Sequence, residues 1–159
     1  MEQGLATFRR LGDRVNEVNA LDNIGLIYRD LEDYRRAIEF YEQSLPIFRE
    51  LGDQGGEGVA LGNLGNIYQS LGDYRRALEY HEQALATFRA LDDRRNEGSA
   101  LGNLGNTYQS LGDYRRAIEY HEQHLAIARD LDYRAGEGRA LSSLGNAYLS
   151  LDDYPRAIE

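Results

Sequence analysis

The sequence contains no cysteine, no tryptophan and no lysine, and its 159 residues include 1 methionine and 2 prolines. Without cysteine the chain has no disulfide and no thiolate for catalysis or metal binding. Because lysine is absent, all 18 strongly basic residues are arginines, and they face 27 Asp and Glu for a formal net charge of −9. An acidic surface repels phosphate backbones and anionic lipid heads, so we expect no nucleic-acid and no membrane partner.

Long apolar runs are missing as well. No run approaches the ~18 residues that a membrane-spanning helix needs. The start, Met1-Glu2-Gln3-Gly4, lacks the basic and apolar blocks of a secretory signal. We therefore expect a cytoplasmic protein.

The sequence repeats itself. Leucines stand 40 residues apart, at Leu21, Leu61, Leu101 and Leu141. The segment 61–80 recurs at 101–120 with only Thr107 in place of Ile67 and Ile118 in place of Leu78. A period of about 20–50 residues indicates a stacked array, in which each unit buries its apolar face against its neighbours. Such arrays bind other molecules more often than they catalyse reactions.

Each repeat predicts a helical hairpin. The apolar residues Leu61, Leu64 and Tyr68 follow helical spacing. Gly72 favours the left-handed end of this helix, and Asp73 favours the start of the next. First helices are expected at 14–30, 54–70, 94–110 and 134–150, and second helices at 34–50, 74–91 and 114–131. We predict one array, residues 1–159, consisting of a half helix at 1–11, hairpin units at 14–51, 54–91 and 94–131, and an incomplete unit at 134–159.

These residues bring a known family into view. The pattern Leu61-x2-Leu64-Gly65-x2-Tyr68, followed by Ala77-x3-His81, resembles the tetratricopeptide repeat (TPR). The unit here has 40 residues where the family has about 34, and it is most similar to the repeats of Partner-of-Inscuteable proteins and bacterial relatives. The resemblance implies an all-α solenoid of antiparallel hairpins stacked in a right-handed superhelix. It also implies a non-enzymatic scaffold that binds a protein or peptide partner.

Polar side chains recur on one face of the first helices. Asn63, Asn66 and Gln69 point away from the apolar stripe, since a helix advances about 100° per residue. A carboxamide both donates and accepts hydrogen bonds, so a column of them suits the main chain of an extended peptide. In peptide-binding TPR proteins the equivalents of several of these residues line the groove. The candidate peptide-binding residues are Asn23, Asn63, Asn66, Gln69, Asn103, Asn106, Gln109, Arg139 and Asn146. The alternative is that they bond to neighbouring helices and set the pitch of the superhelix.

Positions that differ between units would determine which ligand side chains the groove contacts. One such position holds Asn19, Val59, Ser99 and Arg139 in successive units. Arg139, with Arg95 and Arg29 nearby, is a candidate for fixing an acidic side chain of the ligand. The alternative reading is solvated surface arginine.

The remaining repeated residues favour structural roles. Glycine inside a helix costs about 1 kcal/mol relative to alanine, so the series of Gly25, Gly65, Gly105 and Gly145 predicts a close approach of the paired helices. His81 and His121 replace Tyr41 at a packed position and are expected in the core. The arginines at 9, 49, 89 and 129 are expected to pair with the glutamates at 17, 57, 97 and 137. The arginine pairs 35–36, 75–76 and 115–116 are expected to form salt bridges across the seam between units.

No cofactor, metal site or enzymatic activity is expected. His121-x2-His124 has the spacing i, i+3, not the i, i+4 of a helical zinc motif. No nucleophile stands beside a base, and no phosphate loop appears.

A second hypothesis concerns self-assembly. The segment 2–9 matches 82–89, and 157–159 matches 77–79, so both ends fall inside a second helix. Such half helices would stack end to end into a homo-oligomer or filament. Light scattering on the purified chain tests this, and a mass of one chain at every dilution would contradict it.

Overall fold

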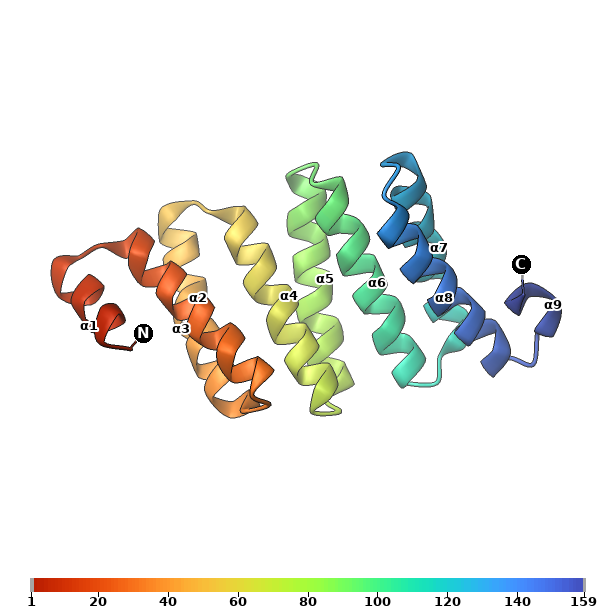
Figure 1. Cartoon of the computed structure of the whole chain (residues 1–159), viewed down its shortest axis with the longest axis horizontal. Helices are drawn as coiled ribbons and strands as arrows, with labels where there is room; N and C mark the ends of the chain where they lie inside the picture. The colour runs from red at the N-terminus through yellow and green to blue at the C-terminus, as the bar shows by residue number, and fades with distance from the viewer. Residues whose placement is uncertain (1, 159) are drawn as a thin grey trace.

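The computed structural model describes residues 2–158, which fold into helices joined by short turns. Along the chain these are α1 (Glu2–Leu11), α2 (Arg14–Asp30), α3 (Tyr34–Leu51), α4 (Gln54–Ser70), α5 (Tyr74–Ala90), α6 (Arg94–Ser110), α7 (Tyr114–Asp130), α8 (Arg134–Ser150) and α9 (Tyr154–Ala157). Consecutive hairpins line up along the long axis, with α1 at one end and α9 at the other (Figure 1). The prediction of an all-α solenoid is confirmed.

The helix bounds follow from the residues at the turns. The predicted first helices have the observed bounds, and the predicted second helices differ by one residue at the carboxyl end. Met1 and Glu159, the outer residues of the predicted end units, lie outside the described residues. At the α4–α5 turn, Gly72 adopts a left-handed φ of 76° and Asp73 caps α5 by accepting a hydrogen bond from the Arg76 N–H. Glycine takes this conformation without steric penalty, and an aspartate cap contributes about 1 kcal/mol.

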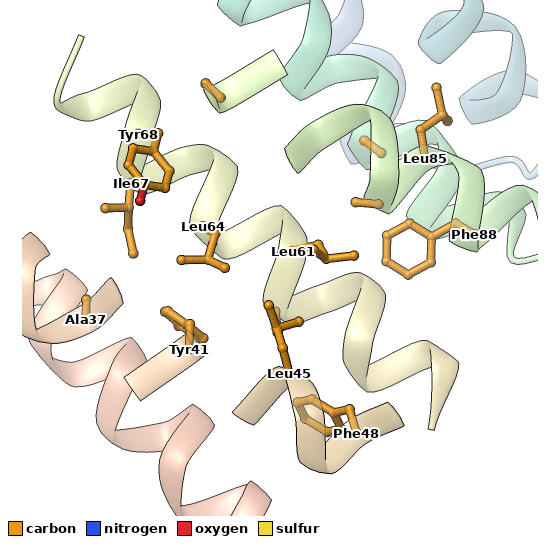
Figure 2. Close-up of a cluster of buried hydrophobic side chains, with 14 of the residues drawn as sticks. Ala37, Tyr41, Leu45, Phe48, Leu61, Leu64, Ile67, Tyr68, Leu85 and Phe88 are labelled. Carbon is orange, nitrogen blue, oxygen red and sulfur yellow. The ribbon is translucent and has the colours of Figure 1, made fainter. Parts of the chain in front are cut away.

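The core lies between the two helices of each hairpin and between successive hairpins. Leu64 and Leu104 are 0 % exposed, and Leu21, Leu61 and Leu101 are buried as well. Figure 2 shows Leu61 and Leu64 of α4 between Tyr41 and Leu45 of α3 on one side and Leu85 and Phe88 of α5 on the other. Each hairpin therefore buries its apolar face partly against the next, as stacked repeats require.

The repeated glycines admit a ring from the second helix. A Cβ added to Gly25 would lie 3.1 Å from the Tyr41 ring, and one added to Gly105 would lie 2.5 Å from the His121 ring. His81 packs on Gly65 in the same way, and both histidines are buried as predicted. The close approach predicted from the glycines is confirmed at Gly25, Gly65 and Gly105, where a ring of the second helix requires it, whereas a Cβ on Gly145 would meet the main-chain oxygen of Ala157 at 3.3 Å.

Ion pairs connect consecutive units. Arg9, Arg49, Arg89 and Arg129 pair with Glu17, Glu57, Glu97 and Glu137 at N–O distances of 3.0, 2.6, 2.9 and 2.9 Å, as predicted. Glu97 is only 6 % exposed and also accepts from Arg94, which satisfies its second oxygen. The same salt bridge therefore recurs at the junctions α1–α2, α3–α4, α5–α6 and α7–α8.

The prediction for the paired arginines was wrong. Arg76 bonds to the capping Asp73 of its own helix, and its guanidinium lies over the Tyr68 ring. Arg75 pairs with Glu79 one turn further along α5. Arg75 and Arg76 therefore pair with carboxylates about one turn away in the same hairpin and not across the seam.

No helix within residues 2–158 combines the length and the apolar character needed to cross a bilayer.

Candidate functional site

The first helices of the units carry two adjoining hollows. The α4–α6 hollow has a volume of about 130 Å³ and is lined by Gly58, Val59, Gly62, Asn63, Asn66, His81, Ala84, Phe88, Asn96, Ser99, Ala100 and Asn103. The α6–α8 hollow has a volume of about 430 Å³ and is lined by Ser99, Gly102, Asn103, Asn106, His124, Arg139, Ser142 and Ser143. Ser99 and Asn103 of α6 line both hollows, so the two adjoin along α6, and together they are called the trough below.

Three of the predicted asparagines lie in this trough with uncommitted side chains, that is, with carboxamides that have no hydrogen-bond partner among residues 2–158. Asn66, Asn103 and Asn106 line the hollows, and within residues 2–158 their carboxamides make no side-chain hydrogen bond. Only the main-chain oxygens of Asn103 and Asn106 accept, from Thr107 and Ser110. The side chains are therefore available to donate to a ligand and to accept from it.

Two of the predicted residues make hydrogen bonds between units. Asn63 also lines the α4–α6 hollow, but its Oδ1 accepts from the Arg29 Nη1 at 3.0 Å. Gln69 Oε1 accepts from the Thr107 hydroxyl at 3.2 Å, and its Nε2 donates to the Ser110 hydroxyl at 3.5 Å. These contacts tie α2 to α4 and α4 to α6. They favour the pitch-setting interpretation for Gln69, whereas Asn63 combines such a contact with a place in the trough.

The other predicted amides lie apart from the hollows. Asn23 on α2 and Asn146 on α8 are exposed, and Gln109 on α6 is half-buried. None of the three is among the residues that line the two hollows. The structure therefore brings together Asn63, Asn66, Asn103, Asn106 and Arg139, and leaves Asn23, Gln109 and Asn146 outside this group.

Arg139 is part of a cluster that the sequence analysis located only in part. Its Nη2 donates to the Tyr133 hydroxyl at 2.9 Å, and its guanidinium carbon lies 5.3 Å from the centre of the Tyr133 ring. Arg95 of α6 lies over the same ring at 4.5 Å. The hydrogen bond from Arg139, followed by that from Arg95, lowers the pKa of Tyr133. Tyr133 was missed, although it stands where the other units have Asp13, Asp53 and Asp93.

His124 of α7 lines the α6–α8 hollow. It is 7 % exposed and replaces Ala84 of the preceding unit. Burial, and secondarily the charge of Arg139, lowers the pKa of His124, so the ring is neutral at neutral pH. Within the described part of the chain, no three His, Asp or Glu side chains are grouped as a metal site would require.

Comparison with known proteins agrees with the fold. The model of the tetratricopeptide repeat family matches residues 1–50, 56–130 and 99–159. The chain belongs to the tetratricopeptide repeat family. No curated protein sequence matches it.

Several solved structures share the fold. BtubC (BKLC) from P. vanneervenii is 29% identical, with a TM-score of 0.83 over 91% of this chain and 60% of its own. A Rap protein complexed with competence and sporulation factor is 20% identical, with a TM-score of 0.82 over 91% of this chain and 40% of its own. The TPR domain of Arabidopsis FLU is 27% identical, with a TM-score of 0.63 over 65% of this chain and 87% of its own. The chain thus spans about 60% of BtubC and about 40% of the Rap protein.

Proposed function

We propose that this TPR array is a non-enzymatic scaffold that binds an extended peptide segment of a partner protein in the trough. The single observation that carries the proposal is the set of uncommitted carboxamides of Asn66, Asn103 and Asn106 along two hollows that meet at α6. An extended main chain presents alternating N–H and C=O groups, and each carboxamide can satisfy both kinds.

A small residue between the asparagines of α4 supports the same function. A Cβ added to Gly62 would meet nothing within 4 Å, so its surface is low and open. A peptide backbone can approach such a surface closely. The equivalent Gly102 of α6 is buried, and a Cβ there would lie 3.0 Å from the His124 ring. A Rap protein that shares this fold over 40% of its length forms a complex with competence and sporulation factor, which is consistent with ligand binding by an array of this kind.

The first prediction tests the free carboxamides. Asn66→Ala combined with Asn106→Ala should weaken binding by at least about tenfold, or about 1.4 kcal/mol, because each lost hydrogen bond contributes about 0.5–1.5 kcal/mol net. The probe is a peptide selected on the wild-type chain from a random library, and affinity is measured by calorimetric titration. Helicity by circular dichroism should not fall, since alanine is the better helix former.

The matched control removes carboxamides that lie outside the trough. Gln83 and Gln123 are exposed on the second helices and donate to backbone oxygens of their own helices. Gln83→Ala with Gln123→Ala should leave the affinity unchanged. If the asparagine variant binds the selected peptide as tightly as the wild type does, the carboxamides are not the binding groups.

A further inference from the structure

Two equivalent positions differ among the hairpins α2–α3, α4–α5 and α6–α7. The position on the first helix holds Asp22, Gly62 and Gly102, and the position on the second helix holds Ser44, Ala84 and His124. In the α6–α7 hairpin the two positions are in contact, because a Cβ added to Gly102 would lie 3.0 Å from the His124 Nδ1. Since the units are nearly identical elsewhere, the same place can be compared from one hairpin to the next.

In the α4–α5 hairpin this place is open. Gly62 has no side chain, and a Cβ added to it would meet nothing within 4 Å. Ala84 contributes only a methyl group, and both residues line the α4–α6 hollow. The hollow therefore includes the space that the His124 imidazole fills one unit later.

The α2–α3 hairpin fills the same place from the first helix. Asp22 stands where α4 has Gly62, and it is half-buried, with its Oδ1 buried. Of the three hairpins, only α4–α5 has no side chain larger than a methyl group at both positions. A space that two units fill and one unit leaves open is available to a ligand.

The walls of the α4–α6 hollow suit an uncharged side chain. Val59, Phe88 and Ala100 provide apolar surface, and among the residues that the structure describes no Asp, Glu or Arg lines this hollow. His81 also lines it and is neutral at neutral pH, because burial lowers its pKa to about 4. A charged side chain would lose its hydration in the hollow without gaining a partner of opposite charge.

The size of the α4–α6 hollow suits one ring. Its volume is about 130 Å³, and an apolar cavity of about 150 Å³ holds a benzene molecule. Phe88 forms one wall, and its ring lies closely under α4, since a Cβ on Gly58 would lie 2.8 Å from it. A second aromatic ring beside Phe88 can make an edge-to-face or offset-stacked contact. The double ring of a tryptophan is too large for this space.

We propose that the α4–α6 hollow is a subsite for one uncharged, single-ring side chain of the ligand, with phenylalanine as the best fit. The inference rests on the proposed function, because the ring belongs to the peptide whose main chain the asparagines hold. Asn66 and Asn103 line the same hollow, so they can hold the main chain on either side of the ring. His124 on Gly102 shows how a ring lies on the glycine of a first helix.

The experiment fills the hollow with the ring that the next unit carries. Peptides are selected from a random library on the wild-type chain and on Ala84→His. Wild-type selection should enrich phenylalanine at one fixed place, and Ala84→His should lose this enrichment. A selected phenylalanine peptide should bind Ala84→His at least about tenfold more weakly, since the burial of its ring is lost. The matched control is Ala86→His, the same substitution at an exposed position of α5, which should change nothing.

A second variant narrows the hollow without adding a ring. Gly62→Ala adds one methyl group to the open space and favours the helix, so it should weaken binding of the phenylalanine peptide by severalfold in a folded chain. The counterpart peptide with alanine in place of phenylalanine should bind the wild type and Gly62→Ala equally. This pair of peptides separates the loss of the ring from any change in the main-chain contacts.

Nuclear magnetic resonance locates the ring. The methyl proton signals of Val59 and Ala84, which line the hollow, should shift when the phenylalanine peptide binds, because an aromatic ring shields the protons over its face. The alanine counterpart should not produce these shifts.

The contrary outcomes are distinct. If the peptides selected on the wild type show no ring preference, or the same preference as those selected on Ala84→His, the ring subsite is wrong and the proposed function stands. If the tryptophan counterpart binds the wild type more tightly than the phenylalanine peptide, the assignment to a single ring is wrong. If neither chain retains any peptide, both proposals fail.

Discussion

The two hollows share helix α6, yet they differ in size and chemistry. Residues 61–66 on α4 and 101–106 on α6 have the same sequence, so each hollow is lined by an equivalent pair of asparagines, Asn63 with Asn66 and Asn103 with Asn106. The α4–α6 hollow is bounded by Ala84 and Phe88 and measures about 130 Å³. The α6–α8 hollow is bounded by His124, Arg139 and two serines and measures about 430 Å³.

The difference between the two hollows separates two kinds of residue in this array, those that repeat and those that do not. Residues with the strict period build the frame, since the buried leucines, the glycines under the rings and the junction salt bridges recur from unit to unit. Single departures from the period set the local chemistry of the trough. In our proposals the asparagines grip any extended main chain, and the α4–α6 hollow selects a ring side chain.

The largest expected effect is a loss of folding stability at low pH, which acts on the buried frame beneath both hollows. Burial lowers the pKa of His81 and of His121 from 6.5 to about 4, and none of their four ring nitrogens has a hydrogen-bond partner in the described structure. The unfolded chain therefore takes up protons at a higher pH than the folded chain. Stability should be full above pH 6.5 and fall as pH drops toward 4, by roughly 3 kcal/mol per histidine. Urea denaturation across this range measures the loss.

The first unit provides the control for this prediction. It carries Tyr41 at the equivalent place, so His81→Tyr with His121→Tyr should remove most of the acid-dependent loss. Asp22 acts in the opposite direction, because burial raises its pKa to about 6 and the folded chain then binds the proton first. Its contribution increases stability as pH falls from about 6. An acid limb that persists in the double histidine variant would show that other groups cause it.

A smaller effect separates the two kinds of glycine. Gly105→Ala places a methyl group 2.5 Å from the His121 ring, which is only 1 % exposed. Overpacking of this kind costs about 1–3 kcal/mol and should exceed the gain in helix propensity. Gly62→Ala meets nothing within 4 Å and should stabilise by up to about 1 kcal/mol. Thermal denaturation compares them, and equal shifts of the same sign would contradict the distinction.

The sequence predicts the frame well, because the frame depends on local rules. Leu64, Gly72 and Asp73 define a buried face, a left-handed helix end and a cap, and these fix helix bounds within one residue. The direction of Asn66 and Asn106 follows from helical geometry alone. His81 and His121 could be placed in the core because they occupy the repeat position that holds Tyr41 in an earlier unit.

The partners of polar side chains could not be predicted in the same way. Gln69 lies on the same helical face as Asn66, but it reaches Thr107 and Ser110 because α4 and α6 approach at its end. A helical wheel shows the directions of side chains on one helix but not the distances between side chains of different units. Tyr133 lies at the N-cap of α8, outside the helix, so helical spacing does not give the direction of its ring, and its contact with Arg95 joins positions 38 residues apart. Both depend on how successive hairpins are stacked.

The smallest expected effect isolates one hydroxyl group. Tyr133→Phe keeps the ring that covers Gly136 but removes the acceptor for the Arg139 Nη2. Stability should change by less than about 0.5 kcal/mol. The affinity for a selected peptide should not change, since Tyr133 lines neither hollow. Calorimetric titration measures this, and Asn66→Ala with Asn106→Ala is the control that weakens binding. If Tyr133→Phe weakens binding as well, the ligand contacts the chain beyond the two hollows.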